Sequence, residues 1–183
     1  MENVTVVSPR DLVNQAQTAY EAEEFQQAAR LFLDAAEAYK TSGDDILAAE
    51  AMNNQSVALL KAGDAKGALA AAEGTDQIFA SVGDQRRQAM ALGNVASALD
   101  DLKERERALD LYRQSAALFE KINEPDLRAL VMQRISSIQM QQGKRIEAMA
   151  TMQDGLAQKK NLSLADRILK GLLRTIGKMA GKS

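Results

Sequence analysis

A 40-residue repeat constrains this chain more than any other feature of its sequence. Small and large apolar positions both recur at this spacing: Ala28, Ala68, Ala108 and Ala148, and sixteen residues before each of them Leu12, Met52, Leu92 and Met132. A fixed period between 20 and 50 residues is typical of solenoids, in which similar modules stack and form a long continuous surface. We therefore look for function in a surface and not in a single deep pocket.

The composition favours helices over strands. Of the 183 residues, 46% are hydrophobic, enough to bury a core, but only 4% are aromatic and Pro occurs twice. Ala and Leu supply most of the apolar content, and we expect an all-α protein. The sequence contains neither Cys nor His. Disulfides, thiolate nucleophiles, His-dependent triads and His-containing zinc sites are therefore excluded.

The charge is distributed unevenly along the chain. Residues 159–183 hold seven basic side chains and one acidic one, whereas the remaining residues hold 16 basic and 24 acidic side chains. An acidic body argues against a nucleic-acid partner. The N-terminus lacks the basic start and apolar run of a signal peptide, and no stretch of the chain is apolar enough to span a membrane. We expect a cytoplasmic protein with a flexible N-terminal tail at residues 1–8.

Each repeat predicts two helices. The units cover residues 9–48, 49–88, 89–128 and 129–161, with the last copy degrading near its end. From Phe25 to Tyr39, apolar residues follow three- and four-residue steps, which is the spacing of one buried helical face. Pro9 after Ser8 indicates the first helix start. Turn residues that stop helices occur within units at Gly63 and Gly143, and between units at Gly43, Gly83 and Asn123.

A second set of small residues lies twelve positions before the recurring alanines: Ala16, Ser56, Ala96 and Ser136. Two helices can approach closely where both offer a small side chain. This pattern resembles the tetratricopeptide repeat over residues 9–161. The resemblance implies a right-handed α-α superhelix, a solenoid of four helical hairpins that acts through protein binding.

The period of 40 exceeds the 34 residues usual for tetratricopeptide repeats, and we expect the extra length in the second helix and the junction after it. Forty-residue repeats with a Gly-Asp junction, as at Gly83-Asp84, resemble those of spindle-orientation adaptors and kinesin light chains. That resemblance implies an extended peptide as the ligand.

A polar ladder is the main candidate binding feature. Asn14, Asn54 and Asn94 recur at the 40-residue spacing, and Arg134 takes the equivalent place in the fourth unit. In tetratricopeptide proteins this face lines the concave groove, where an Asn amide can hold a peptide backbone and Arg a carboxylate. By the same register, we expect further side chains to face this groove: Gln17, Tyr20, Val57, Lys61, Ser97, Asp101, Ser137 and Gln141. The alternative is that the ladder is a solvated helix face left by duplication of one ancestral unit.

The C-terminal segment predicts a ninth helix, from the capping pattern Ser163 to Asp166 as far as about Ala180. Its apolar residues, Leu172 and Ile176 among them, occupy one half of the helical wheel, and basic residues occupy the other half: Arg167, Lys170, Arg174 and Lys178. Such a helix caps the open end of a solenoid, lies on an anionic membrane, or binds a partner or a second copy.

Sequence motifs for catalysis are weak. Gly181-Lys182-Ser183 imitates the end of a phosphate-binding loop, but Ile176 stands where its first glycine belongs. The acid pairs Asp44-Asp45 and Asp100-Asp101 are expected at helix ends. We predict a non-catalytic adaptor or scaffold without metal or cofactor, binding a protein segment in its groove. The alternative is a peripheral membrane protein or a self-assembling scaffold that acts through residues 162–183.

Overall fold

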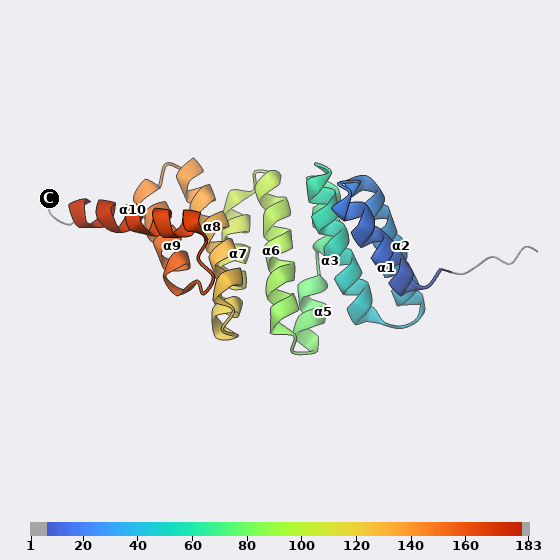
Figure 1. Cartoon of the computed structure of the whole chain (residues 1–183). Coiled ribbons are helices and arrows are strands. Elements are labelled where there is room, and N and C mark those ends of the chain that lie inside the picture. Colours follow the sequence, from blue (N-terminus) through green and yellow to red (C-terminus); the bar gives the residue numbers. More distant parts are fainter. Residues whose placement is uncertain (1–6, 181–183) are drawn as a thin grey trace, which may run out of the picture. The chain divides into compact units, whose positions relative to one another are not determined.

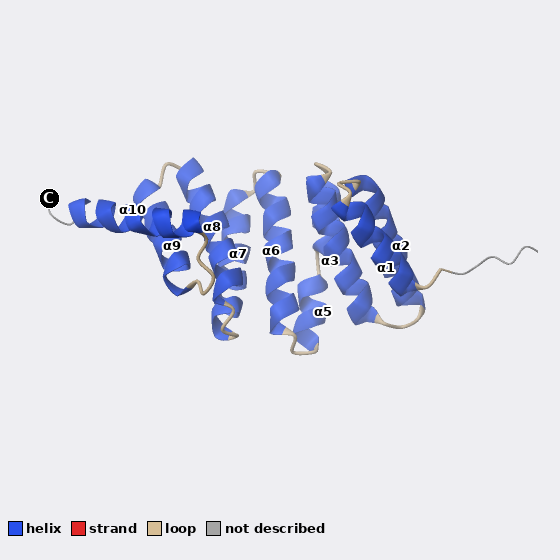
Figure 2. Cartoon of the chain, viewed as in Figure 1, coloured by secondary structure: helices blue, strands red, loops and turns tan. Residues whose placement is uncertain are grey.

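The computed structural model describes residues 7–180, with side chains as far as residue 175. Residues 1–6 and 181–183, and with them most of the predicted N-terminal tail, lie outside the described part. All regular structure in residues 7–180 is helical (Figures 1 and 2), which confirms the all-α prediction. The helices are α1 (Pro9–Glu21), α2 (Phe25–Thr41), α3 (Asp45–Lys61), α4 (Ala65–Ala72), α5 (Thr75–Ser81), α6 (Gln85–Asp101), α7 (Arg105–Lys121), α8 (Pro125–Gln141), α9 (Arg145–Gln158) and α10 (Leu164–Ala180).

The chain divides into two compact units, residues 1–108 and 109–183, with the boundary inside α7. In the first unit α1 packs against α2, and α3 packs against α2, α4, α5 and α6. In the second unit α8 packs against α9, and α10 against α9. The helices of the first, second and fourth repeats thus pack as the predicted hairpins. The right-handed sense of the superhelix stays a prediction.

A left-handed residue occurs every 20 positions from Glu23 to Gly143, in the turn that follows each of α1, α2, α3, α5, α6, α7 and α8. Glycine takes four of these positions, Gly43, Gly63, Gly83 and Gly143, and Glu23, Lys103 and Asn123 take the others, all with φ between 57° and 82°. The glycines and Asn123 were predicted as helix stops, and the prediction is confirmed. The half-repeat is therefore 20 residues long, and both helices of a repeat reach 17 residues, as α3 and α7 do. The extra length is not confined to the second helix.

Side-chain caps follow three of these turns. Asp44, Asp64 and Asp84 accept hydrogen bonds from backbone N–H groups three residues later, at 3.0, 2.9 and 2.9 Å. Ser8 caps α1 in the same way at 3.2 Å, with Pro9 as the first helical residue. Each cap satisfies one of the N–H groups that the first turn of a helix leaves without a partner.

The small residues of both series lie in the packed interior between helices. All members of both small-residue series are buried: Ala16, Ser56, Ala96 and Ser136, and Ala28, Ala68, Ala108 and Ala148. The Ser136 hydroxyl donates to the carbonyl oxygen of Ala148 at 2.7 Å. This bond joins the small-residue positions of α8 and α9, the two helices of the fourth hairpin. The predicted packing is therefore confirmed, and small side chains set the helix separation.

The second repeat departs from the two-helix expectation. Its second helix breaks into α4 and α5 at Gly74, whose φ of 81° is left-handed. The other repeats have Asp34, Gln114 and Asp154 in this register. The buried Thr75 donates from its hydroxyl to the carbonyl oxygen of Ala72 at 2.6 Å and so closes the break. A glycine tolerates this conformation without the steric cost of a Cβ atom.

Candidate binding grooves of the first unit

Asn14, Asn54 and Asn94 do not line one common groove. Asn14 is exposed and lines a cavity of about 530 Å³ formed by α1, α2 and the turn between them. Asn54 belongs to α3, the helix that follows this hairpin in the chain, and it lines two other cavities. Asn94, on α6, shares the second of these cavities with Asn54.

The first cavity of Asn54 opens between α1 and α3. It measures about 430 Å³ and is lined by Gln17, Tyr20, Glu21, Phe32, Asn54 and Val57. The buried Phe32 forms its floor, while Gln17 and Asn54 supply amides from the two helices. The groove therefore offers apolar surface together with paired donors and acceptors, a combination that suits a peptide segment.

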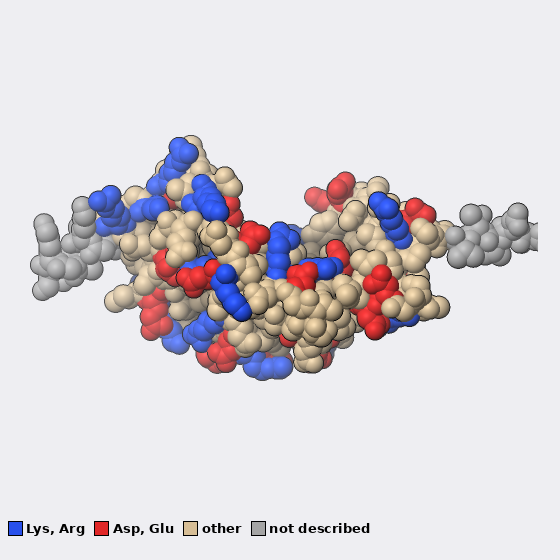
Figure 3. All heavy atoms as spheres, turned by 90° about the horizontal axis from the view of Figure 1, so that it is seen from below, with Lys and Arg blue, Asp and Glu red and all other residues tan. Residues whose placement is uncertain are grey.

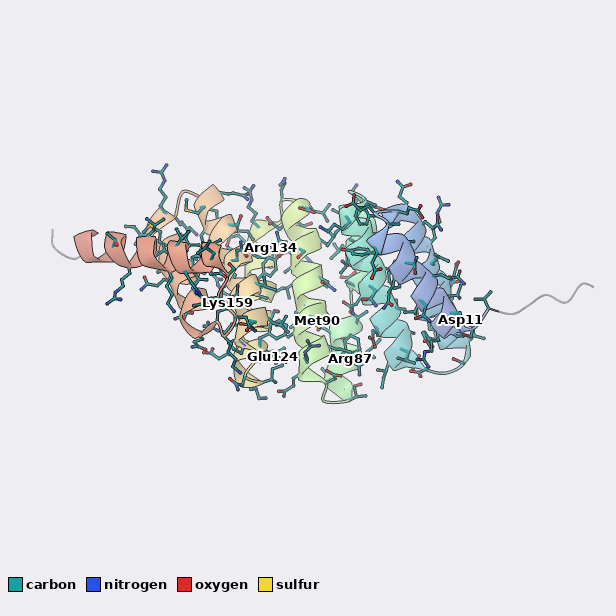
Figure 4. All side chains as sticks on the ribbon, in the orientation of Figure 1. Asp11, Arg87, Met90, Glu124, Arg134 and Lys159 are labelled. Carbon is teal, nitrogen blue, oxygen red and sulfur yellow. The ribbon has the colours of Figure 1, made fainter. Side chains whose placement is uncertain are left out.

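The second cavity, between α3, α5 and α6, is called the α3–α6 pocket below. It measures about 310 Å³, and its lining residues are Glu50, Asn53, Asn54, Val57, Phe79, Asp84, Arg86, Arg87, Met90 and Asn94. Arg87 and Met90 both project from the first half of α6 (Figure 4). Phe79, which belongs to α5 after the break at Gly74, lies in the wall of this pocket.

Arg87 is held firmly in the α3–α6 pocket. Its Nε donates to Oδ2 of Asp84 at 2.7 Å, one terminal nitrogen donates to Oε2 of Glu50 at 2.9 Å, and the guanidinium lies 5.2 Å from the ring centroid of Phe79. Hydrogen bonds from the backbone and then the side chain of Arg87 lower the pKa of Asp84. The three helix segments are thereby joined by a charge-assisted network.

A buried polar network forms the inner wall of the same pocket. Asn53 donates from Nδ2 to the hydroxyl of Thr75 at 2.8 Å and to the carbonyl oxygen of Ala49 at 3.2 Å, and it accepts from Nδ2 of Asn94 at 3.0 Å. The side chain of Asn94 thus joins the second repeat to the third. The amide of Asn54, by contrast, makes no hydrogen bond to the described residues and faces both cavities.

The remaining groove candidates lie elsewhere. Lys61 is exposed at the end of α3 and lines neither cavity of Asn54. Arg134 is exposed on α8 in the second unit (Figure 4). Gln141, the last residue of α8, is exposed as well. A larger cavity of about 740 Å³ at the turn between α1 and α2 is lined by Glu23, Phe25, Arg30 and their neighbours, none of them predicted.

The predicted capping box at the start of α10 is present. The N–H of Asp166 donates to the Ser163 hydroxyl at 3.1 Å, and the N–H of Ser163 donates to Oδ2 of Asp166 at 2.9 Å. Lys159 donates to the same carboxylate at 2.6 Å, and these contacts lower the pKa of Asp166 to about 2. Upstream, Asp126 accepts from the backbone N–H and side-chain amide of Asn161 at 3.3 and 2.7 Å. The segment before α10 is therefore tied to the start of α8.

Of the predicted α10 residues, Arg167, Leu172 and Arg174 are exposed and Lys170 is half-buried. The side chains of Ile176 and Lys178 lie outside the described residues. Within the described part of the chain, none of the helices is both long and apolar enough to cross a membrane.

Several residues of the α3–α6 pocket were not predicted. Arg87 stands where the register has Leu47 and Leu127, and Asn53 stands where it has Val13, Gly93 and Gln133. For Arg87 the available signal was a charged side chain at a position that is leucine in two other repeats; for Asn53 the signal is weaker, because Gln133 also carries an amide. The pattern does not reveal the distant partners of these side chains, which lie 22 to 41 residues away in sequence: Glu50 for Arg87, and Thr75 and Asn94 for Asn53.

Stacked helical hairpins with small residues at their crossings define a tetratricopeptide-like repeat protein. The sequence model of the family "SNAP: Soluble NSF attachment protein" matches residues 7–173, and the chain belongs to this family. The match supports the tetratricopeptide-like repeat and a protein partner in general, but not the closer resemblance to spindle-orientation adaptors and kinesin light chains. No curated protein sequence matches the chain.

Proposed function

We propose that this protein is a non-catalytic adaptor that binds an extended segment of a protein partner in the grooves on either side of Asn54. The name of its family describes attachment to a protein, NSF, which supports a role in protein assembly. The observation that carries the proposal is the amide of Asn54, which lines both cavities and makes no hydrogen bond to the described residues. A peptide backbone would supply the missing donor and acceptor.

The two grooves offer different contacts to the partner segment. The α1–α3 groove supplies the apolar floor of Phe32 and the amide of Gln17, which suits a segment with alternating apolar and polar side chains. The α3–α6 pocket adds Arg86 and Met90 at its edge. Asn14, Lys61, Arg134 and Gln141 stay predicted contacts for a longer partner.

The experiment compares partner capture by the wild-type chain and by the double variant Gln17→Ala/Asn54→Ala, followed by titration calorimetry with the captured protein. We expect the variant to bind at least about tenfold more weakly, because both free amides of the groove are removed. The matched control is Gln77→Ala, an exposed residue of α5 that lines neither groove. Equal affinity of the double variant and the wild type, with an unchanged melting temperature, rules out the groove.

A second candidate function is a peripheral membrane or self-assembling scaffold that acts through α10. The observation that favours it is the exposure of Leu164, Ile168 and Leu172 in the folded chain. Large apolar side chains this exposed in the described part of the chain support a contact outside the repeat array.

A further inference from the structure

The outward face of α10 is an apolar stripe. Leu164, Ile168 and Leu172 are 75%, 57% and 57% exposed, and they follow one another at four-residue steps. Residues at this spacing lie above one another on one side of a helix. Three large apolar side chains in a row on a surface mark a contact site, whereas scattered ones need no explanation.

The opposite face of α10 holds the helix to the second unit. Leu173 is only 6% exposed, and Nζ of Lys170 donates to the carbonyl oxygen of Leu156 in α9 at 3.3 Å. At about 100° per residue, Leu173 lies about 140° from the centre of the stripe. The stripe therefore faces away from the body while α10 stays attached, and its contact needs no detachment of the helix.

Positive charge borders the stripe. Arg167 and Arg174 are exposed and lie about 100° to one side of it on the helical wheel. The only acid of residues 164–175, Asp166, is already paired with Lys159 at 2.6 Å. Figure 3 shows basic side chains beside the C-terminal end of the described chain. The outward surface of α10 is thus apolar and cationic.

This combination is complementary to an anionic lipid surface and not to a second copy of the helix. Packing stripe against stripe would bring Arg167 and Arg174 of both copies to one interface, with no free acid on the described part of α10 to pair with them. At a bilayer, apolar side chains enter between the headgroups while arginines extend to the lipid phosphates.

We propose that α10 docks in the plane of an anionic bilayer through Leu164, Ile168 and Leu172, with Arg167 and Arg174 contacting the headgroups. This inference rests on the second candidate function and names its partner. The adaptor grooves of the first unit are independent of it.

The test is co-sedimentation of the full chain with vesicles of phosphatidylcholine alone and of phosphatidylcholine with phosphatidylserine. We expect binding to the anionic vesicles, little binding to the neutral ones, and weakening as salt is raised. Equal binding to both vesicles, or binding to neither, overturns the proposal.

Two variants separate the apolar and the charged contributions. The triple variant Leu164→Ser/Ile168→Ser/Leu172→Ser and the double variant Arg167→Glu/Arg174→Glu should each bind anionic vesicles at least about tenfold more weakly. The matched controls change exposed residues of the first unit, Leu33→Ser and Lys40→Glu/Lys66→Glu, and should bind as the wild type does. Undiminished vesicle binding by either α10 variant contradicts the proposal.

Light scattering after size-exclusion chromatography tests the competing occupant. If the wild type is a dimer that the triple variant converts to a monomer, and vesicle binding is absent, the stripe belongs to a second copy and the lipid proposal fails. The groove variant Gln17→Ala/Asn54→Ala should keep full vesicle binding, so a failure of the adaptor function is recognised separately.

Discussion

Asn94 donates a hydrogen bond of 3.0 Å to the buried Oδ1 of Asn53, and so ties α6 to α3. The residue that the 40-residue register assigns to ligand binding is thus also part of the packing between repeats. Asn54, one residue after Asn53, has no such bond and faces the grooves. Adjacent asparagines on one helix therefore have different roles, and mutation should separate them.

Replacing Asn53 by Ala should lower the free energy of unfolding by about 2 kcal/mol, because the buried Thr75 and the Asn94 amide lose their partner. Replacing Asn54 by Ala should change it by less than about 0.5 kcal/mol, since that side chain makes no bond to the described residues. Urea unfolding followed by circular dichroism measures both values. If Asn53→Ala lowers the free energy of unfolding no more than Asn54→Ala does, the hydrogen bonds of Asn53 do not stabilise the fold as expected.

The left-handed turn at Lys103 should be improved by glycine. Lys103 has a φ of 68°, a conformation that costs a residue with a Cβ atom about 1 kcal/mol. We expect Lys103→Gly to raise the free energy of unfolding by about 0.5 kcal/mol, after the larger chain entropy of an unfolded glycine is subtracted. The reverse change at the equivalent turn, Gly63→Lys, should lower it. Thermal melting checks the opposite signs, and a shared sign refutes the strain argument.

Two helical glycines should respond differently to alanine. A Cβ atom at Gly155 would lie 2.8 Å from Cβ of Met132, whereas at Gly171 it would meet nothing within 4 Å. Gly171→Ala should stabilise the chain by about 0.5 to 1 kcal/mol through helix propensity. Gly155→Ala gains the same propensity but overpacks α8 against α9, and we expect a net loss of about 1 kcal/mol. Chemical unfolding of both variants in parallel is the measurement.

Attachment of α10 should weaken in acid. Hydrogen bonding from Lys159, followed by that from Ser163, lowers the pKa of Asp166 in the folded chain from 3.8 to about 2. A depressed folded-state pKa contributes stability above the unfolded value, and this contribution is lost as the pH falls from about 4 to about 2. The protection factors for hydrogen exchange in residues 164–175, which are corrected for the intrinsic pH dependence of exchange, should therefore fall across this window.

The variant Asp166→Asn provides the control for the acid experiment. It removes the titrating carboxylate but keeps a side chain that can accept from Ser163, so the protection factors in α10 should be lower at neutral pH and nearly independent of pH below 4. If the variant keeps the acid response of the wild type, another group is responsible, with Asp126 and its contacts to Asn161 the next to examine.

Most of the fold was predictable because its signals are local. Gly43, Gly83 and Asn123 stop helices through their own backbone preferences, and Ser8 and Ser163 start them through bonds to residues three positions on. The candidate site was predictable only in part. Gln17 and Asn54 follow from the register, and the contact of Arg87 to Asp84 is local, but its contact to Glu50 joins residues 37 positions apart that meet only when helices stack.

The sequence alone determined the repeat length, the helical class and the positions of the close helix crossings, because these depend on periodic small residues and on turns of a few residues. Tertiary structure alone decided that Asn94 bonds to Asn53, that the second repeat breaks at Gly74, and that α10 turns Leu164, Ile168 and Leu172 outward while Leu173 is buried. The reason is physical: backbone preference acts over a few residues, whereas a hydrogen-bond partner or an exposed face exists only once helices have packed.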